Sequence, residues 1–416
     1  MRLGDSKTVP LRVAVDASVK MALHEIGKPR SPDRTMTEPN PILHVLQRTE
    51  ETGAARDSIG NFETQHCTRR WDASLYRPVA DEMLHTAFPQ WREGISWPEG
   101  KRFAACLSHD VDMVQIDSRY ELARTIALNF HHAPGAGKKL KHLASAVGLR
   151  KAPRKFDVFT PWVEAEQRFG FRSSFFFFPT RVRERHVIDN VYRWDDRTTY
   201  RDETCSVREI ARDLHQRGWD IGLHGSYLSP LSYEMLAEQK EDVEKAIGET
   251  VVTSRQHNLH FDSAKTPALL EKAGLKVDST LGSNRDIGFR AGTSYPFRLW
   301  DAAARDWLQL VEIPLVLHDG ALLRPDNLDL NLESAFALCK TVIDRVVETR
   351  GVVTLLWHPD KAALPDWFTL YTRLLAYIHE QNGWGASARD IHEWWASSGM
   401  AARHHDLVLK LAEGAR

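Results

Sequence analysis

The sequence predicts a parallel β/α barrel preceded by an accessory segment, and two observations support this prediction. From residue 101 onward, short apolar runs alternate with amphipathic stretches of helical period. Such alternation is typical of a parallel sheet whose strands are joined by right-handed helical crossovers. The length of 416 residues suits one large α/β domain with an additional segment.

Seven segments have the composition of buried parallel strands, being short and rich in apolar, β-branched or aromatic residues. They are 103–110, 171–179, 219–224, 254–259, 276–281, 311–317 and 352–358. Amphipathic helices are predicted between them at 207–217, 233–247, 266–273 and 332–350. Seven such units favour a closed or nearly closed barrel, a distorted (β/α)7 arrangement. An open doubly wound sheet is the alternative, because periodicity alone does not separate the two.

Three regions are predicted along the chain. Residues 1–100 mix short apolar runs with polar, Pro-containing stretches and form an N-terminal accessory segment or cap. Residues 101–400 form the barrel, and residues 401–416 form a C-terminal tail. Within the long first crossover, residues 138–155 are rich in Lys and Arg, which predicts a solvated basic helix. A rim that attracts an anionic substrate is the alternative for this stretch.

The composition argues against several classes of protein. A net charge of −1 gives no reason to expect a nucleic-acid or anionic-membrane partner. The four cysteines form no CxxC pair, which indicates reduced thiols rather than a disulfide or zinc-ribbon framework. The first residues lack a signal-peptide pattern, and no window of about 18 apolar residues exists. A cytoplasmic location without a membrane span is therefore expected.

Ionisable side chains stand at or near the ends of five predicted strands. In chain order they are Asp110, Asp112, His224, Arg255, His257, Asp278 and His358. In a parallel barrel, catalytic groups come from the carboxyl ends of several strands. One such residue alone is usually a structural histidine or a helix cap. Their coincidence at separate strand ends indicates a functional site.

The residue types favour a metal-assisted reaction. Asp110 and Asp112 are two residues apart, so their carboxylates face the same side of an extended chain. Two close carboxylates repel each other unless a positive charge lies beside them. One Asp with two His is a familiar ligand set for a divalent ion such as zinc. The second Asp is then free to act as a base on water held by the ion.

These segments, taken in order, resemble the motifs of the polysaccharide deacetylases, the NodB-like carbohydrate esterases, over roughly residues 101–400. The first strand ends in Ser-His-Asp-Val-Asp at 108–112, which resembles the TFDDG motif and its DxD variant. Residues 173–179, Ser-Ser-Phe-Phe-Phe-Phe-Pro, resemble the ATFFF strand. The resemblance implies a distorted barrel of that family's type, with Asp110 as general base and Asp112 as a metal ligand.

The second family motif, H[ST]xxH, is altered here. It reads His-Gly-Ser-Tyr-Leu at 224–228, so His224 matches the first metal histidine and Leu228 occupies the position of the second. Leucine cannot bind a metal ion, and His257 is the predicted replacement as third ligand. His260 is a weaker candidate because, three residues further on, it is expected on the other face of the strand.

The remaining motifs complete the predicted site. Arg255 resembles the third-motif arginine that steadies the base, and Asp278 resembles the fourth-motif aspartate. Residues 356–358, Leu-Trp-His, resemble the fifth motif, in which an apolar residue lines the acyl pocket and the histidine, His358, acts as general acid. The loop 282–300 has glycines, arginines and aromatic residues that suit contact with a sugar. The predicted substrate contacts are Ser226, Tyr227, Arg290 and Trp357.

The resemblance implies removal of an N-acetyl group from a saccharide or glycan precursor that contains an amino sugar. Water held by a divalent ion, most simply zinc, would attack the amide carbonyl, and His358 would protonate the leaving amine. One alternative is hydrolysis of another amide or ureide C–N bond, because related ureide and cyclic-amide hydrolases also alter the metal motif. The other is a sugar-binding descendant without catalysis, against which the joint presence of Asp110, Asp112, His224 and His358 argues.

Overall fold

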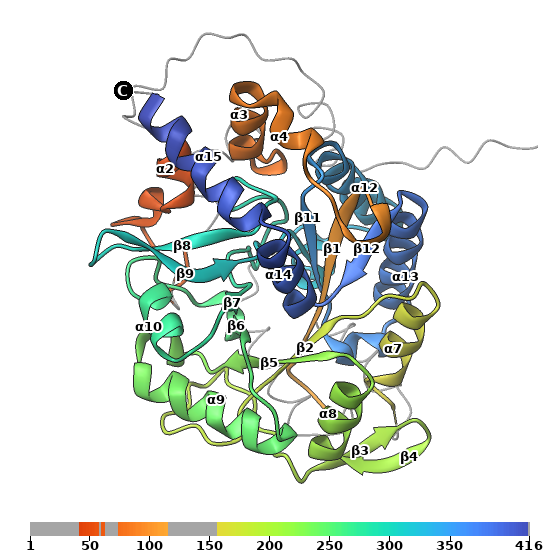
Figure 1. The fold of residues 1–416 in the computed structure, drawn as a ribbon. Helices are drawn as coiled ribbons and strands as arrows, with labels where there is room; N and C mark the ends of the chain where they lie inside the picture. Colours follow the sequence, from red (N-terminus) through yellow and green to blue (C-terminus); the bar gives the residue numbers. More distant parts are fainter. Residues whose placement is uncertain (1–40, 58–59, 63–73, 115–155, 415–416) are drawn as a thin grey trace, which may run out of the picture.

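The computed structural model describes residues 41–57, 60–62, 74–114 and 156–414. A ten-stranded, mostly parallel sheet forms its centre (Figure 1). Its main path runs β10-β11-β1-β2-β5-β6-β7-β9-β8, and β12 pairs with β1. The strands are β1 Phe103–Val111, β2 Ser174–Phe177, β5 Asp220–Gly225, β6 Thr253–Gln256, β7 Val277–Asp278, β8 Phe297–Asp301, β9 Asp306–Glu312, β10 Leu317–His318, β11 Val352–Leu356 and β12 Gly383–Ala386. Within this sheet, only β8 runs antiparallel to its neighbour.

The two ends of the parallel run lie close together, which shows that the sheet curls into an incomplete barrel. β9 and β10 stand at opposite ends of the run, yet only residues 313–316 separate them. Such a segment spans roughly 18 Å at most between its flanking residues. The Ile313 N–H donates to Asp278 of β7, and the Val316 N–H donates to Thr354 of β11. The predicted distorted barrel is therefore confirmed, and the open doubly wound alternative is not observed.

Several strand predictions need correction. The predicted strand 311–317 is divided between β9 and β10, because Pro314 between them has no N–H for the ladder. The predicted strand 254–259 ends at Gln256, after which His257–Leu259 forms the 3-10 turn η7. Four described strands were not predicted, namely β8, β12 and the two strands of an antiparallel hairpin, β3 Arg197–Tyr200 and β4 Glu203–Ser206.

The predicted helices are observed with bounds that differ by at most one residue. They are α8 Val207–Gln216, α9 Tyr233–Ile247, α10 Thr266–Lys272 and α12 Leu332–Thr349. Local sequence explains their ends. A capping box of Ser206 and Glu209 begins α8, and Ser232 caps the N-terminus of α9. Gly248, with φ of 87°, ends α9 in the left-handed conformation that glycine tolerates.

The other helices complete the outer layer of the barrel. They are α7 Thr160–Gln167, α11 Asp319–Leu323, α13 Pro365–Glu380 and α14 Ala388–Ser397. Short 3-10 turns occur at η6 Ser229–Leu231 and η8 Pro359–Ala363. Between α12, α13 and the sheet lies an apolar cluster that includes Leu107, Val353 and Trp357. No described helix is long and apolar enough to cross a membrane.

The described part of the accessory segment packs with the C-terminal helix at one side of the molecule (Figure 1). It contains α2 Pro41–Leu46, η1 Thr49–Glu51, η4 Ser74–Tyr76, α3 Val79–Ala87, α4 Pro89–Glu93 and η5 Pro98–Gly100. The region predicted as a tail forms α15 Met400–Gly414, which contacts α2, α3 and β8. The basic stretch 138–155 lies outside the described residues.

Candidate metal centre and active site

Asp112, His224 and His257 converge at the carboxyl edge of the sheet. Asp112 directly follows β1, His224 lies in β5, and His257 directly follows β6. The Asp112 Oδ1 lies 3.3 Å from the His224 Nε2 and 3.9 Å from the His257 Nε2. One ligand atom from each residue lies within 4.8 Å of the others, so this triad could hold a metal ion. Two ligand atoms bound to one tetrahedral zinc ion are about 3.3 Å apart, a spacing that the Asp112–His224 distance matches and the Asp112–His257 distance exceeds.

The two histidine rings are oriented by hydrogen bonds at their other nitrogen. The His224 Nδ1 lies 2.9 Å from the Arg255 carbonyl oxygen, and the His257 Nδ1 lies 3.4 Å from the Asp189 Oδ1. An acceptor at Nδ1 fixes the proton there and leaves the Nε2 lone pair for a metal ion. Both Nε2 atoms face the Asp112 carboxylate, which is the arrangement a metal ligand set requires.

The charges around Asp112 favour a cation at the same place. Burial by itself would raise the pKa of Asp112, but the hydrogen bond from His224 and the nearby His257 and His358 hold that pKa well below its usual value. Burial by itself would lower the pKa of His224, but the carboxylates of Asp110 and Asp112 outweigh this effect and raise that pKa. The centre therefore stabilises positive charge, which a divalent ion supplies.

Asp110 is fixed by a buried arginine. The Arg255 Nη1 donates to the Asp110 Oδ1 at 3.0 Å and to the Ser108 Oγ at 2.7 Å. The other side of the guanidinium donates to Ser279, through Nε to its carbonyl oxygen and through Nη2 to its hydroxyl. The second oxygen of Asp110, Oδ2, lies 3.8 Å from the His224 Nε2. Arg255 thus holds one carboxylate oxygen and leaves the other facing the metal triad.

His358 approaches the centre next to the other Asp112 oxygen. Its Nε2 lies 3.5 Å from the Asp112 Oδ2, and its Nδ1 lies 2.9 Å from the Asp319 Oδ1. Burial alone would lower the pKa of His358, but the charge and hydrogen bond of Asp319 outweigh it and raise that pKa to about 9. Burial by itself would raise the pKa of Asp319, but the same contact with His358 lowers that pKa to about 2. The contact with Asp319 therefore favours the protonated form of His358, which has a proton to donate.

The structure places Asp278 away from these groups. Its carboxylate accepts from the Ser254 hydroxyl at 2.7 Å and neighbours Glu312 in the strand register. Burial raises the pKa of Asp278, and that of Glu312 lies well above its usual value for the same reason. Ser254 and Arg255 are consecutive in β6, so Asp278, paired with Ser254, faces the opposite side of the sheet from Arg255. The carboxylate that contacts His358 is Asp319. Asp278, which the sequence analysis matched to the fourth-motif aspartate, does not reach the centre.

The four predicted substrate contacts are all buried and already have protein partners. The Ser226 hydroxyl accepts from Gln239 at 2.7 Å. The Tyr227 ring stacks between His186 and His260. Arg290 donates to both oxygens of Glu51 in the accessory segment, and the Trp357 Nε1 donates to the Trp367 carbonyl oxygen. These contacts support the walls around the centre, and none of the four side chains is open to solvent.

Four polar residues of the centre were missed by the sequence analysis. They are Asp189, Asn190, His318 and Asp319. His318 and Asp319 directly follow the predicted strand 311–317, so the rule about strand ends could have found them. Asp189 and Asn190 lie in the loop between β2 and β3, where no predicted strand places them. The Asn190 Nδ2 donates to the Asp112 Oδ1 at 2.9 Å.

Comparison with solved structures finds similar folds at low sequence identity. A Mycobacterium smegmatis protein assigned to the polysaccharide deacetylases is 18% identical, with a TM-score of 0.48, over 73% of this chain and 93% of that chain. Puue allantoinase is 13% identical, with a TM-score of 0.47, over 72% of this chain and 92% of that chain. A pseudoenzyme of carbohydrate esterase family 4 from Bacillus anthracis is 10% identical, with a TM-score of 0.34, over 71% of this chain and 66% of that chain.

The likeness is to the fold of carbohydrate esterase family 4 and of allantoinase. No sequence profile of a protein family matches the chain, and no curated protein matches it. A fold alone does not specify a function, so a functional assignment depends on the residues of the centre itself.

Proposed function

We propose that this protein is a metal-dependent hydrolase that removes an N-acetyl group from a substrate containing an amino sugar. One observation carries the proposal, namely the arrangement of three groups around Asp112. The triad of Asp112, His224 and His257 has a fixed carboxylate beside it in Asp110, and a charged imidazole, His358, faces it. A ligand set, a base and an acid within one small volume are the parts that hydrolysis of an amide requires.

Asp112, His224 and His257 would hold the divalent ion, for which zinc is the proposed identity. When bound, the ion lowers the pKa of water and stabilises negative charge on the carbonyl oxygen. Asp110 takes a proton from the attacking water at Oδ2, while Arg255 holds Oδ1.

His358 completes the reaction on the leaving-group side. As the carbon–nitrogen bond breaks, its Nε2 gives a proton to the departing nitrogen, and Asp319 stabilises the charged ring before transfer. The products are acetic acid, which ionises to acetate, and an amine, which can take up the proton released. Asp110 gains one proton from water and His358 loses one to nitrogen, so transfer of a proton from Asp110 to His358 through solvent restores both groups.

A second candidate is hydrolysis of a different carbon–nitrogen bond, such as that of a ureide. The observation that favours it is the ligand set, because His257 stands in for the second-motif histidine that Leu228 replaces. The name of one similar structure, an allantoinase, points to the same chemistry. The acid and base serve either reaction, so the choice depends on the substrate alone.

The test combines metal analysis with a substrate panel. We expect about one divalent ion per chain in the purified protein, lost in His224→Ala and retained in the control His405→Ala in α15. Acetate release from N-acetylated amino sugars is measured beside ammonia and urea release from ureides. Acetate release that needs the ion supports the deacetylase, whereas turnover of ureides alone selects the second candidate. A protein without stoichiometric metal, and without activation by added zinc, cobalt or manganese, contradicts both.

A further inference from the structure

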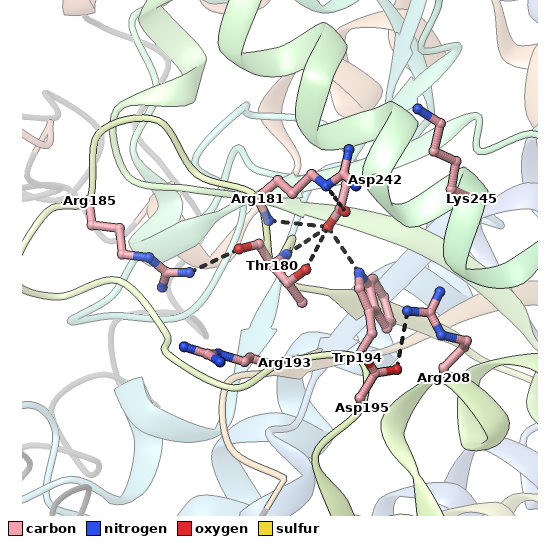
Figure 2. A pocket seen from close by; sticks show the side chains of 9 residues that line it. All are labelled: Thr180, Arg181, Arg185, Arg193, Trp194, Asp195, Arg208, Asp242 and Lys245. Carbon is pink, nitrogen blue, oxygen red and sulfur yellow. Dashed lines mark hydrogen bonds and ion pairs between the residues drawn. The ribbon is translucent and has the colours of Figure 1, made fainter.

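A cavity of about 450 Å³ lies between the β2–β3 loop and the helices α8 and α9 (Figure 2). A volume of this size is within the usual range for small-molecule sites. Its basic lining residues are Arg181, Arg185, Arg193, Arg208 and Lys245. Figure 2 shows them arranged around Trp194 and Asp242.

The cavity has a strong excess of positive charge. Its lining includes five basic side chains and two carboxylates, Asp195 and Asp242. Arg181 lies 3.7 Å from Asp242, and Lys245 pairs with Glu241, outside the lining, at 2.6 Å. Among the described residues, two of the five positive charges, on Arg185 and Arg193, therefore have no carboxylate partner. Asp242 is buried and accepts from the Thr180 N–H at 2.7 Å and from the Trp194 indole at 2.9 Å. Asp242 therefore braces the wall, and Asp195 is 86% exposed beside Arg208 at 3.3 Å.

Two of these cations, Arg185 and Arg193, lack a close acidic partner among the described residues. In the part of the chain that the structure describes, no acidic side chain pairs with the Arg193 guanidinium. The backbone N–H of Arg193 donates to the Asp196 carboxylate. Arg185 donates to the carbonyl oxygens of Thr180 and Asn190, which are neutral acceptors and leave its charge uncompensated. Arg183 on the same loop is different, because both sides of its guanidinium engage Glu238 and it does not line the cavity.

We infer that this cavity binds the phosphate groups of a diphosphate-type ligand. Guanidinium groups match phosphate oxygens bidentately, and phosphate retains more than one charge to satisfy several arginines. A single carboxylate would engage one guanidinium and leave the remaining cations in mutual repulsion. Clustered charge of one sign in a concave site also raises the local concentration of an anionic ligand.

The cavity is connected to the candidate metal centre through one loop. Between its two lining stretches, the β2–β3 loop also carries Asp189 and Asn190, which contact His257 and Asp112. Arg185 donates to the Asn190 carbonyl oxygen, so a cavity side chain and a support of the centre are directly bonded. The inference concerns binding alone and does not depend on the proposed hydrolase activity.

The test is calorimetric titration of the full, metal-loaded chain with pyrophosphate at two salt concentrations. We expect binding that weakens at higher salt. In Arg193→Gln the affinity should fall about tenfold, since the loss of one hydrogen bond to a charged group changes the affinity by about this factor. Arg183→Gln, which makes the same charge change on the same loop, is the matched control and keeps wild-type affinity.

Two results overturn the inference. One is the absence of pyrophosphate binding. The other is binding that is lost in His224→Ala and retained in Arg193→Gln, which would place the anion on the metal centre. Parallel titrations with a nucleoside diphosphate and a short-chain alkyl diphosphate identify the attached group. Tighter binding of either one, or equal affinity for both, supports the diphosphate site, provided that Arg193→Gln weakens it.

Discussion

His257 and His358 face different oxygens of Asp112, and each ring is bonded to a carboxylate through its Nδ1. The Asp189 contact to His257 is long, at 3.4 Å, whereas the Asp319 contact to His358 is 2.9 Å. Asp319 also accepts from the His358 backbone N–H at 2.8 Å. The comparison teaches that one kind of partner can serve two functions. A longer contact orients a ring towards a metal ion, and a close buried one favours the protonated form of a ring that donates a proton.

Removing the proton carriers is the strongest way to test this division. His358→Ala and Asp110→Asn should each lower turnover by about 10²- to 10⁴-fold, because positioned acid and base groups contribute this much. Both variants should keep their metal, since neither residue belongs to the triad. Initial rates with metal content measured on the same samples check the prediction. A rate near that of the wild type in either variant would remove that residue from the mechanism.

The long contact of His257 predicts an effect on metal affinity rather than on acid catalysis. Asp189→Asn should weaken metal binding about 10- to 100-fold, which is typical when the outer partner of a metal histidine is lost. Competition with a chromogenic chelator measures the affinity. Asp319→Asn is the matched control and should bind metal as the wild type does. If both variants lose metal equally, the two histidines do not differ in the way proposed.

The close contact of His358 predicts a shift in the pH profile. A general acid works in its protonated form, so activity is lost as pH rises through its pKa, which Asp319 raises to about 9 against the effect of burial. Asp319→Asn removes the negative charge and should move the alkaline limb of kcat/KM to lower pH. A bound ion lowers the pKa in both proteins, so the shift between them is the quantity to compare. Superimposable alkaline limbs would contradict this account of His358.

The sequence predicted best where many apolar residues repeat. Helix α9 has the predicted bounds, and β1 and β11 follow long buried runs. Strands without such runs were missed. β8 is an antiparallel edge strand that falls within a predicted loop, and β12 reads Gly-Trp-Gly-Ala, a poor strand sequence. A Cβ at Gly385 would lie 2.2 Å from Phe171, so tertiary packing explains that glycine.

The site was predictable only as far as strand ends define it. The rule that functional side chains follow the carboxyl ends of parallel strands located Asp112, His224 and His257, which the fold brings together. It also placed Asp278 at the site, which the structure does not bear out, because the direction of that side chain depends on its register with Ser254 and sequence alone does not give that register. Asp189 depends on the path of a loop that no local pattern specifies.

The claim that His257 replaces the missing second-motif histidine is tested most directly by metal affinity in His257→Ala. His260→Ala is the matched control, since His260 lies three residues away and its Nδ1 is bonded to the Tyr227 carbonyl oxygen at 2.6 Å. We predict that His257→Ala loses more than the roughly 100-fold that removal of an outer partner costs, with unchanged circular dichroism, while His260→Ala binds metal normally. Unchanged affinity in His257→Ala would contradict the account and leave the third ligand of the centre unassigned.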